Sequence, residues 1–112
     1  MSKRNDQELL ADIQEAIQRI QDYVKNIDRA QFMKDLKTQD AVVRNLEIIG
    51  EAVKNVSKSL QSRHKGIAWK DLAKVRDKLV HHYFGVNFDI VWNIIEEPLP
   101  KIALQIDQIL AE

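Results

Sequence analysis

Four side chains that can take part in chemistry lie within a stretch of eight residues: Arg76, Asp77, His81 and Tyr83. Histidine transfers protons near neutral pH. Arginine binds phosphate through a planar fork of donors and stabilises the charge that develops in phosphoryl transfer. RNA carries its own nucleophile, the 2′-hydroxyl, so a histidine and an arginine are sufficient to cleave its backbone without a metal ion.

The spacing of these residues places them on one broad side of a helix. Each helical residue turns by about 100°, so Tyr83, Asp77 and His81 fall at roughly −20°, 100° and 140° from Arg76. Asp77 and His81 form an i,i+4 pair, in which a carboxylate can orient or charge the imidazole. Arg76 and His81 are about 7–8 Å apart along the axis. Either their side chains converge on one phosphate, or a second subunit supplies one of them.

A plainer alternative stays open, because an arginine and a histidine on one helix are more often a surface or interface feature than an active site. A second polar cluster, Arg44, Glu47 and Glu51, has the same ambiguity. Its spacing of i, i+3 and i+7 puts all three on one face. They form either a solvated ladder of ion pairs or a support in which a glutamate holds the Arg76 guanidinium. The three histidines lack the spacing of a metal site, and we expect no cofactor.

Long amphipathic helices must position these residues. Glycine and proline are few, and no segment alternates with period two for long enough to form a strand. We therefore predict an all-α antiparallel bundle of four to five helices, with Thr38 as an N-cap, Gly85 as a stop and breaks at Pro98 and Pro100. Gly50, inside a helix, indicates close approach of a neighbour. Apolar residues at steps of three and four predict helices over about Asp6–Ile27, Thr38–Gln61, Trp69–Phe84, Phe88–Glu97 and Leu99–Leu110, with a helical turn near Phe32, Met33 and Leu36.

The composition is that of a single soluble domain, spanning residues 1–112. Lys plus Arg and Asp plus Glu each number 17, so the formal charge is zero. This balance argues against binding nucleic acid by bulk electrostatics but leaves room for a local basic site. Cysteine is absent, which excludes disulfides and a thiolate nucleophile. There is no signal peptide and no membrane-spanning run, so we expect a cytoplasmic protein that does not bind membranes.

The order of motifs resembles a known family along nearly the whole chain. Arg76-x-x-x-x-His81-x-Tyr83 is similar to the R-x4-H-x-Y signature of HepT-like toxins, a branch of the HEPN superfamily, and Asp77 stands at its usual polar position. The other matching segments are Asp40–Ala52, similar to the family's second-helix block; Trp69, ahead of the catalytic helix; and Tyr83–Asn87, Val91–Trp92 and Leu99–Pro100, similar to its ending.

The resemblance implies a HEPN-like homodimer in which two copies of Arg76 and His81 surround one cleft. It implies the toxin of a type VII-like toxin–antitoxin system, a metal-independent endoribonuclease that leaves a 2′,3′-cyclic phosphate on an RNA such as tRNA or mRNA. His81 would be the general base or acid, Arg76 would bind the phosphate, and Asp77 would position His81. Arg44, Glu47 and Glu51 would be supporting residues.

The implied partner is a nucleotidyltransferase antitoxin that AMPylates Tyr83. The added anion would block the cleft and occupy the charge of Arg76. Two other functions remain alternatives at this point. The chain could be a non-catalytic nucleotide-binding or docking subunit for a nucleotidyltransferase, or a purely structural helical dimer.

Overall fold

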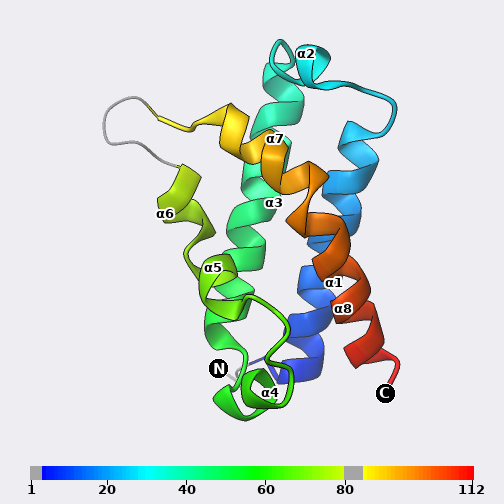
Figure 1. Cartoon of the computed structure of the whole chain (residues 1–112), viewed down its shortest axis with the longest axis vertical. Helices are drawn as coiled ribbons and strands as arrows, with labels where there is room; N and C mark the ends of the chain where they lie inside the picture. The colour runs from blue at the N-terminus through cyan, green and yellow to red at the C-terminus, as the bar shows by residue number, and fades with distance from the viewer. Residues whose placement is uncertain (1–3, 80–84) are drawn as a thin grey trace.

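The chain folds into a bundle of helices that run alternately up and down (Figure 1). The computed structural model describes residues 4–79 and 85–112. The helices are α1 (Asp6–Val24), α2 (Arg29–Phe32), α3 (Leu36–Asn55), α4 (Lys58–Arg63), α5 (Trp69–Ala73), α6 (Val75–Leu79), α7 (Phe88–Glu96) and α8 (Pro98–Leu110). The first long helix, α1, is antiparallel to the second, α3. The short helices α5 and α6 then lead back up the bundle, and the last two, α7 and α8, run down again (Figure 1).

The helices α1 and α3 form the centre of the bundle, and the other helices pack around this pair. α8 packs on α1, α5 and α6 pack on α3, and α7 contacts both α6 and α8. Burial of one large apolar side chain contributes about 1.5–3 kcal/mol to stability, so the predicted apolar stripes hold the bundle together. The elements of the described residues are helices, and the predicted all-α fold is confirmed. The fully buried side chains include Ile13, Ile17, Ile20, Val42, Ile49, Leu99 and Ile106.

α1 begins where the sequence predicts but ends earlier. Asn5 caps it by accepting from the Glu8 backbone N–H, while the Glu8 carboxylate accepts from the Asn5 N–H. The helix stops at Val24 rather than at Ile27 because Asn26 adopts a left-handed φ of 66°. Ile27 still packs against the core from the connecting turn.

The predicted N-cap of the second long helix, Thr38, is wrong. Asp35 is the N-cap of α3, and its carboxylate accepts from both the backbone N–H and the hydroxyl of Thr38, at 3.0 and 2.6 Å. These two hydrogen bonds lower the pKa of Asp35 below its ordinary value of 3.8. The helix therefore begins two residues before the predicted start.

The predicted end of this helix at Gln61 is also wrong, because two helices occupy the predicted range. Val56 adopts an extended conformation, and Ser57 caps the separate helix α4 by accepting from the Leu60 N–H. The Ser57 backbone N–H and hydroxyl both donate to the carboxylate of Asp6, at 2.8 and 2.5 Å. This contact fixes the break against the start of α1.

The helix predicted from Trp69 to Phe84 is divided as well. α5 ends at Ala73, because the next residue, Lys74, has a φ of −103° and a ψ of 11° that depart from helical values, and α6 starts at Val75. The end of the predicted helix, residues 80–84, lies outside the described residues. The chain is described again from Gly85, whose φ of 76° is left-handed as expected for a stop.

The last two helices lie within one residue of their predicted positions. Asn87 donates its N–H to the Leu79 carbonyl at 2.7 Å, which joins the start of α7 to the end of α6, and its side chain caps α7. Pro98 stands at the first position of α8, where its missing N–H costs nothing. Pro100 continues this helix and does not break it. No helix in the described residues is long and apolar enough to cross a bilayer.

Candidate active site

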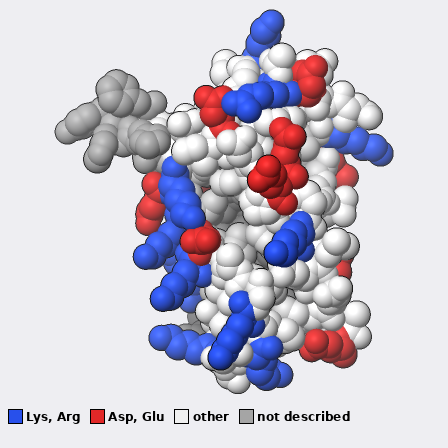
Figure 2. All heavy atoms as spheres, viewed as in Figure 1, with Lys and Arg blue, Asp and Glu red and all other residues white. Residues whose placement is uncertain are grey.

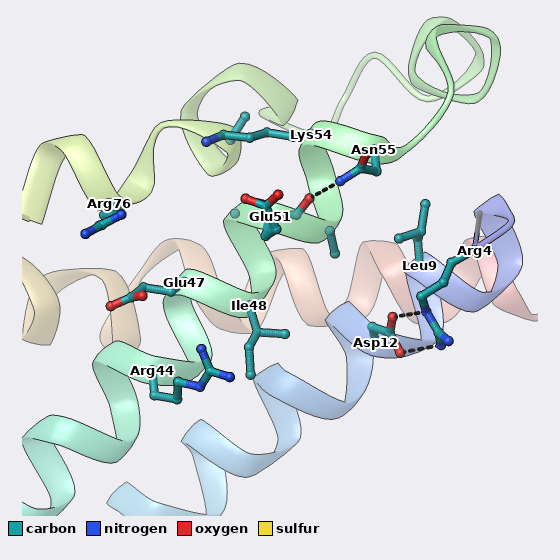
Figure 3. A pocket seen from close by; sticks show the side chains of 13 residues that line it. Arg4, Leu9, Asp12, Arg44, Glu47, Ile48, Glu51, Lys54, Asn55 and Arg76 are labelled. Carbon is teal, nitrogen blue, oxygen red and sulfur yellow. Dashed lines mark hydrogen bonds and ion pairs between the residues drawn. The ribbon is translucent and has the colours of Figure 1, made fainter. Parts of the chain in front are cut away.

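A groove of about 480 Å³ opens between the start of α1, the middle of α3 and the α5–α6 segment (Figure 3). We call it the Arg76 groove. It contains four of the residues predicted to form the site. Its lining consists of Arg4, Leu9, Asp12, Arg44, Glu47, Ile48, Gly50, Glu51, Ala52, Lys54, Asn55, Ala73 and Arg76.

The structure brings Arg76 together with the polar cluster of α3. Arg44, Glu47 and Glu51 reach the groove from one face of that helix, as their spacing predicts, and Arg76 reaches it from α6. Figure 3 shows the Glu47 carboxylate extending toward the side of the groove on which Arg76 lies. The i, i+3, i+7 pattern is therefore part of the same site as Arg76.

The predicted ion pair between Arg76 and a glutamate is absent from the described residues, as is the ladder joining Arg44 to Glu47. The residues that are not described include no Asp or Glu. Arg76 is exposed, so its guanidinium keeps its N–H donors available to an anion in the groove.

Gly50 explains how α6 comes so close to α3. A Cβ at this position would lie 3.2 Å from the Leu72 carbonyl oxygen and 3.3 Å from Cγ1 of Val75. The expectation of a close neighbour is therefore confirmed. The missing side chain lets the α5–α6 segment rest on the backbone of α3, and this contact carries Arg76 to the groove.

No motif in the sequence predicts the ion pair at the far wall of the groove. Arg4 donates twice to Asp12, at 2.7 and 2.8 Å (Figure 3). The hydrogen bonds and charge of Asp12 raise the pKa of Arg4 above its ordinary value. Because these two charges satisfy each other, the remaining charges that the described residues bring to the groove are three cations and two carboxylates: Arg44, Lys54, Arg76, Glu47 and Glu51.

Two of the predicted chemical residues cannot be placed. His81 and Tyr83 lie outside the described residues, so the separation between Arg76 and His81 remains a prediction. Asp77 is exposed on α6 and does not line the groove. Its proposed pairing with His81 also remains a prediction. Within residues 4–79 and 85–112, no three His, Asp or Glu side chains are placed to hold a metal ion.

A buried amide on α3 is a further polar feature. Asn45 is 4% exposed, and its side-chain N–H donates to the Ala41 carbonyl at 2.9 Å. Its Oδ1 is buried and has no hydrogen-bond partner in the described part of the chain. Such an orphan acceptor is rare in folded proteins.

The neutral formal charge conceals a strongly basic segment. Residues 54–78 hold eight Lys or Arg and two Asp, a net charge of +6, and all ten side chains are exposed. Figure 2 shows cationic side chains gathered at the left and lower edge of this face, where α4, α5 and α6 lie in Figure 1. The local basic site that the sequence left open is therefore present and borders the Arg76 groove.

Comparison with known proteins identifies a family. A family model described as "Ribonuclease HepT-like" matches residues 13–109, which include the α3 and α6 walls of the groove and the whole Arg76–Tyr83 stretch. A Methanocaldococcus jannaschii protein named as a candidate RNase is 40% identical over 112 residues, covering 100% of this chain and 93% of that protein.

Two further relatives agree. A Thermococcus cleftensis protein named as a probable ribonuclease HepT is 43% identical over 100 residues, 89% of this chain and 91% of its own length. A candidate RNase of Caldanaerobacter subterraneus is 47% identical over 87 residues, 78% of each chain. No solved structure matches this chain.

Proposed function

Because this chain belongs to the HepT-like ribonuclease family, we propose that it is an endoribonuclease that cleaves RNA at the Arg76 groove without a metal ion. The observation that carries the proposal is the meeting of Arg76 from α6 with Arg44 and two glutamates from α3 in one open groove. A phosphate diester fits an exposed guanidinium that has no carboxylate partner within 4.0 Å among the described residues.

The proposed reaction uses the nucleophile of the substrate. His81 removes the proton of the 2′-hydroxyl, and the 2′-oxygen attacks the adjacent phosphorus. Arg76 donates to the non-bridging oxygens and stabilises their growing charge. The bond to the 5′-oxygen breaks, that oxygen takes up a proton, and the products end in a 2′,3′-cyclic phosphate and a 5′-hydroxyl. Asp77 positions His81.

Glu47 and Glu51 have a supporting role in this proposal. Their carboxylates line the same groove as Arg76 without forming an ion pair to it. Their negative potential draws the guanidinium toward the groove while leaving its donors for the substrate. Arg44 supplies a second cation on the α3 wall.

We further propose a homodimer with two copies of the site around one cleft. The five-residue spacing of Arg76 and His81 supports it, because a helix would separate them by about 7–8 Å along its axis. A second copy can then supply the histidine that one copy holds too far from its own arginine.

Regulation by a nucleotidyltransferase antitoxin completes the proposal and makes the chain a toxin. The Tyr83 hydroxyl would attack the α-phosphate of ATP, forming a tyrosyl–AMP diester and releasing pyrophosphate. The new anion would lie seven residues from Arg76, about two turns along the same face of a helix, and would compete with RNA for its guanidinium.

Cleavage of total RNA and of a tRNA pool in excess EDTA tests the activity. The parent protein should yield cyclic-phosphate ends, while Arg76→Ala and His81→Ala should each be slower by about 100-fold or more. Arg19→Ala is the matched control, because Arg19 is an exposed arginine of α1 paired with Glu15 at 2.6 Å and lies outside the groove. It should cleave at the parental rate.

Two outcomes would contradict the proposal. Absence of cleavage by protein whose mass shows an unmodified Tyr83 would favour the non-catalytic nucleotide-binding or docking subunit. Equal cleavage by all four proteins would place the activity elsewhere, in another site or in a contaminant.

A further inference from the structure

A second groove, also of about 480 Å³, lies between α4, the connection that follows it and α5. The proposed cleavage reaction does not use it. Its charged lining comprises Lys58, Lys65, Lys70 and Asp71, and its neutral lining includes Gln61, Ser62 and Trp69. We call it the lysine groove.

The lysine groove carries a surplus of positive charge. Its single carboxylate, Asp71, pairs with Lys78 of α6 at 3.1 Å. None of the three lysines forms an ion pair among the described residues, and residues 1–3 and 80–84 contain no acid. Three ammonium groups therefore face solvent in one hollow without a carboxylate partner.

The backbone that holds these lysines is fixed by contacts beneath it. The indole of Trp69 is buried and donates to the His64 carbonyl at 2.9 Å. Gln105 of α8 donates to the Gly66 carbonyl at 3.0 Å. Ile67, which lies between Gly66 and Trp69 in the sequence, is buried. The connection between α4 and α5 is thus tied to the bundle at three neighbouring residues, which keeps the groove formed.

The two grooves are lined by neighbouring segments of the chain. The first two residues of α5, Trp69 and Lys70, line the lysine groove, and its last residue, Ala73, lines the Arg76 groove. On the other wall, Lys54 lines the Arg76 groove and Lys58, four residues later, lines the lysine groove. A flexible polyanion bound at Arg76 therefore has a cationic path onto the lysine groove.

We propose that the lysine groove binds the phosphate backbone of RNA beside the bond cleaved at the Arg76 groove. This inference rests on the proposed ribonuclease function, because it states how that substrate is held. Lysine is a hydrated point charge without a bidentate fork, so the groove contributes affinity without reading bases. An acidic protein surface is less suited, because protein interfaces have an apolar core. The exposed large hydrophobics of the described residues, Tyr23, Leu36 and Leu104, lie on α1, α3 and α8.

Binding and cleavage can be measured separately. The binding probe is a fluorescein-labelled, fully 2′-O-methylated RNA of mixed sequence, which lacks the 2′-hydroxyl nucleophile and stays intact. Its anisotropy is titrated with the full-length parent and with the Lys58→Gln/Lys65→Gln/Lys70→Gln triple variant at several salt concentrations. The control triple, Lys25→Gln/Lys34→Gln/Lys101→Gln, removes the same charge from exposed lysines outside the basic segment. Circular dichroism checks that all three proteins are folded.

The groove triple should bind the probe about 10- to 100-fold more weakly at 0.1 M salt. Its slope of log Kd against log salt should be smaller by about 2, as expected for three lost contacts to a single strand. The control triple should stay within about threefold of the parent, because its lysines are not on the path. On unmodified RNA, the groove triple should raise KM by a similar factor.

The outcomes separate this inference from the proposed function. Equal weakening by both triples would overturn it, since only net charge would then matter. An unchanged Kd for the groove triple would also overturn it, since the three lysines would then not contact the RNA. If the Kd changes as expected while unmodified RNA is never cleaved, the groove is supported and the nuclease proposal fails.

Discussion

Asn45 is a buried side chain that the fold does not fully satisfy. A buried acceptor without a partner costs about 1–3 kcal/mol, and Oδ1 of Asn45 is such an acceptor in the described residues. Its side-chain N–H donates to a carbonyl within α3 itself. This hydrogen bond therefore adds little stability beyond that of the helix's own backbone hydrogen bonds. Gln39, equally buried on the same helix, instead donates to the Phe32 carbonyl of α2 at 2.9 Å and links two elements.

We therefore expect that replacing each of these two amides with leucine has opposite effects on the free energy of unfolding. Asn45→Leu, which keeps the shape and removes the orphan acceptor, should raise the free energy of unfolding by about 1 kcal/mol. Gln39→Leu should lower it by about 1 kcal/mol or more, because the Phe32 carbonyl loses its side-chain donor. Urea unfolding measures both. If Asn45→Leu is destabilising, Oδ1 has a partner in solution that the described residues do not include.

At the scale of elements, the contact between α3 and the α5–α6 segment decides whether the site forms. Replacing a helical glycine with alanine usually stabilises by about 1 kcal/mol. Gly50→Ala should not, because its Cβ would press on the Leu72 carbonyl at 3.2 Å, and backbone yields less easily than a side chain. We expect a lower midpoint of thermal unfolding and slower RNA cleavage, since the segment that carries Arg76 must move outward.

Gly66→Ala is the matched control for this substitution. Among the described residues, its Cβ would meet only Nε2 of Gln105, at 3.8 Å, an ordinary contact. Stability and cleavage should stay close to those of the parent. If both alanine variants behave alike, the close approach at Gly50 does not position the site.

The N-cap of α3, Asp35, makes the stability of the folded protein depend on pH. Hydrogen bonds from Thr38 lower the pKa of Asp35 in the folded state, so the carboxylate stabilises the fold above its ordinary pKa of 3.8. This contribution is lost as the pH falls through the lower folded pKa. Asp35→Asn keeps a good cap without the charge. The stability advantage of the parent over this variant should shrink between pH 5 and pH 2, as followed by urea unfolding. A pH-independent difference would contradict the assignment.

The sequence was sufficient for elements whose ends carry local signals. Asn5 and Asn87 are good caps, and α1, α7 and α8 lie within three residues of their predicted bounds. The break after α3 was missed because Val53, Val56 and Leu60 continue the helical spacing of apolar residues across it. At that break, the cap of Ser57 and its contact with Asp6 outweigh the periodicity. Lys74 carries no breaker signal at all.

The site was predictable only in part, for a similar reason. Helical spacing correctly put Arg44, Glu47 and Glu51 on one face, because that property is local. Their meeting with Arg76 depends on the packing of α5–α6 at Gly50, which periodicity does not contain. The pairing of Arg4 with Asp12 reaches across the first turns of α1 and has no motif.

At the scale of the whole molecule, charge is segregated along the chain. Residues 54–78 carry +6, so the rest of the chain carries −6 to give the formal zero. Composition alone reports only the cancelled total, and for that reason it argued against electrostatic binding of nucleic acid. The fold keeps the basic segment together at α4, α5 and α6, next to both grooves.

A neutral molecule with separated charges behaves as an electric dipole. The field of a polyanion exerts a torque on such a molecule before any contact forms, and it turns the basic side forward. The encounter rate with RNA then depends on ionic strength although the net charge is zero, because salt screens that torque beyond about 10 Å at 0.1 M. The positions of the lysines thus affect the orientation of the protein during approach as well as its affinity after contact.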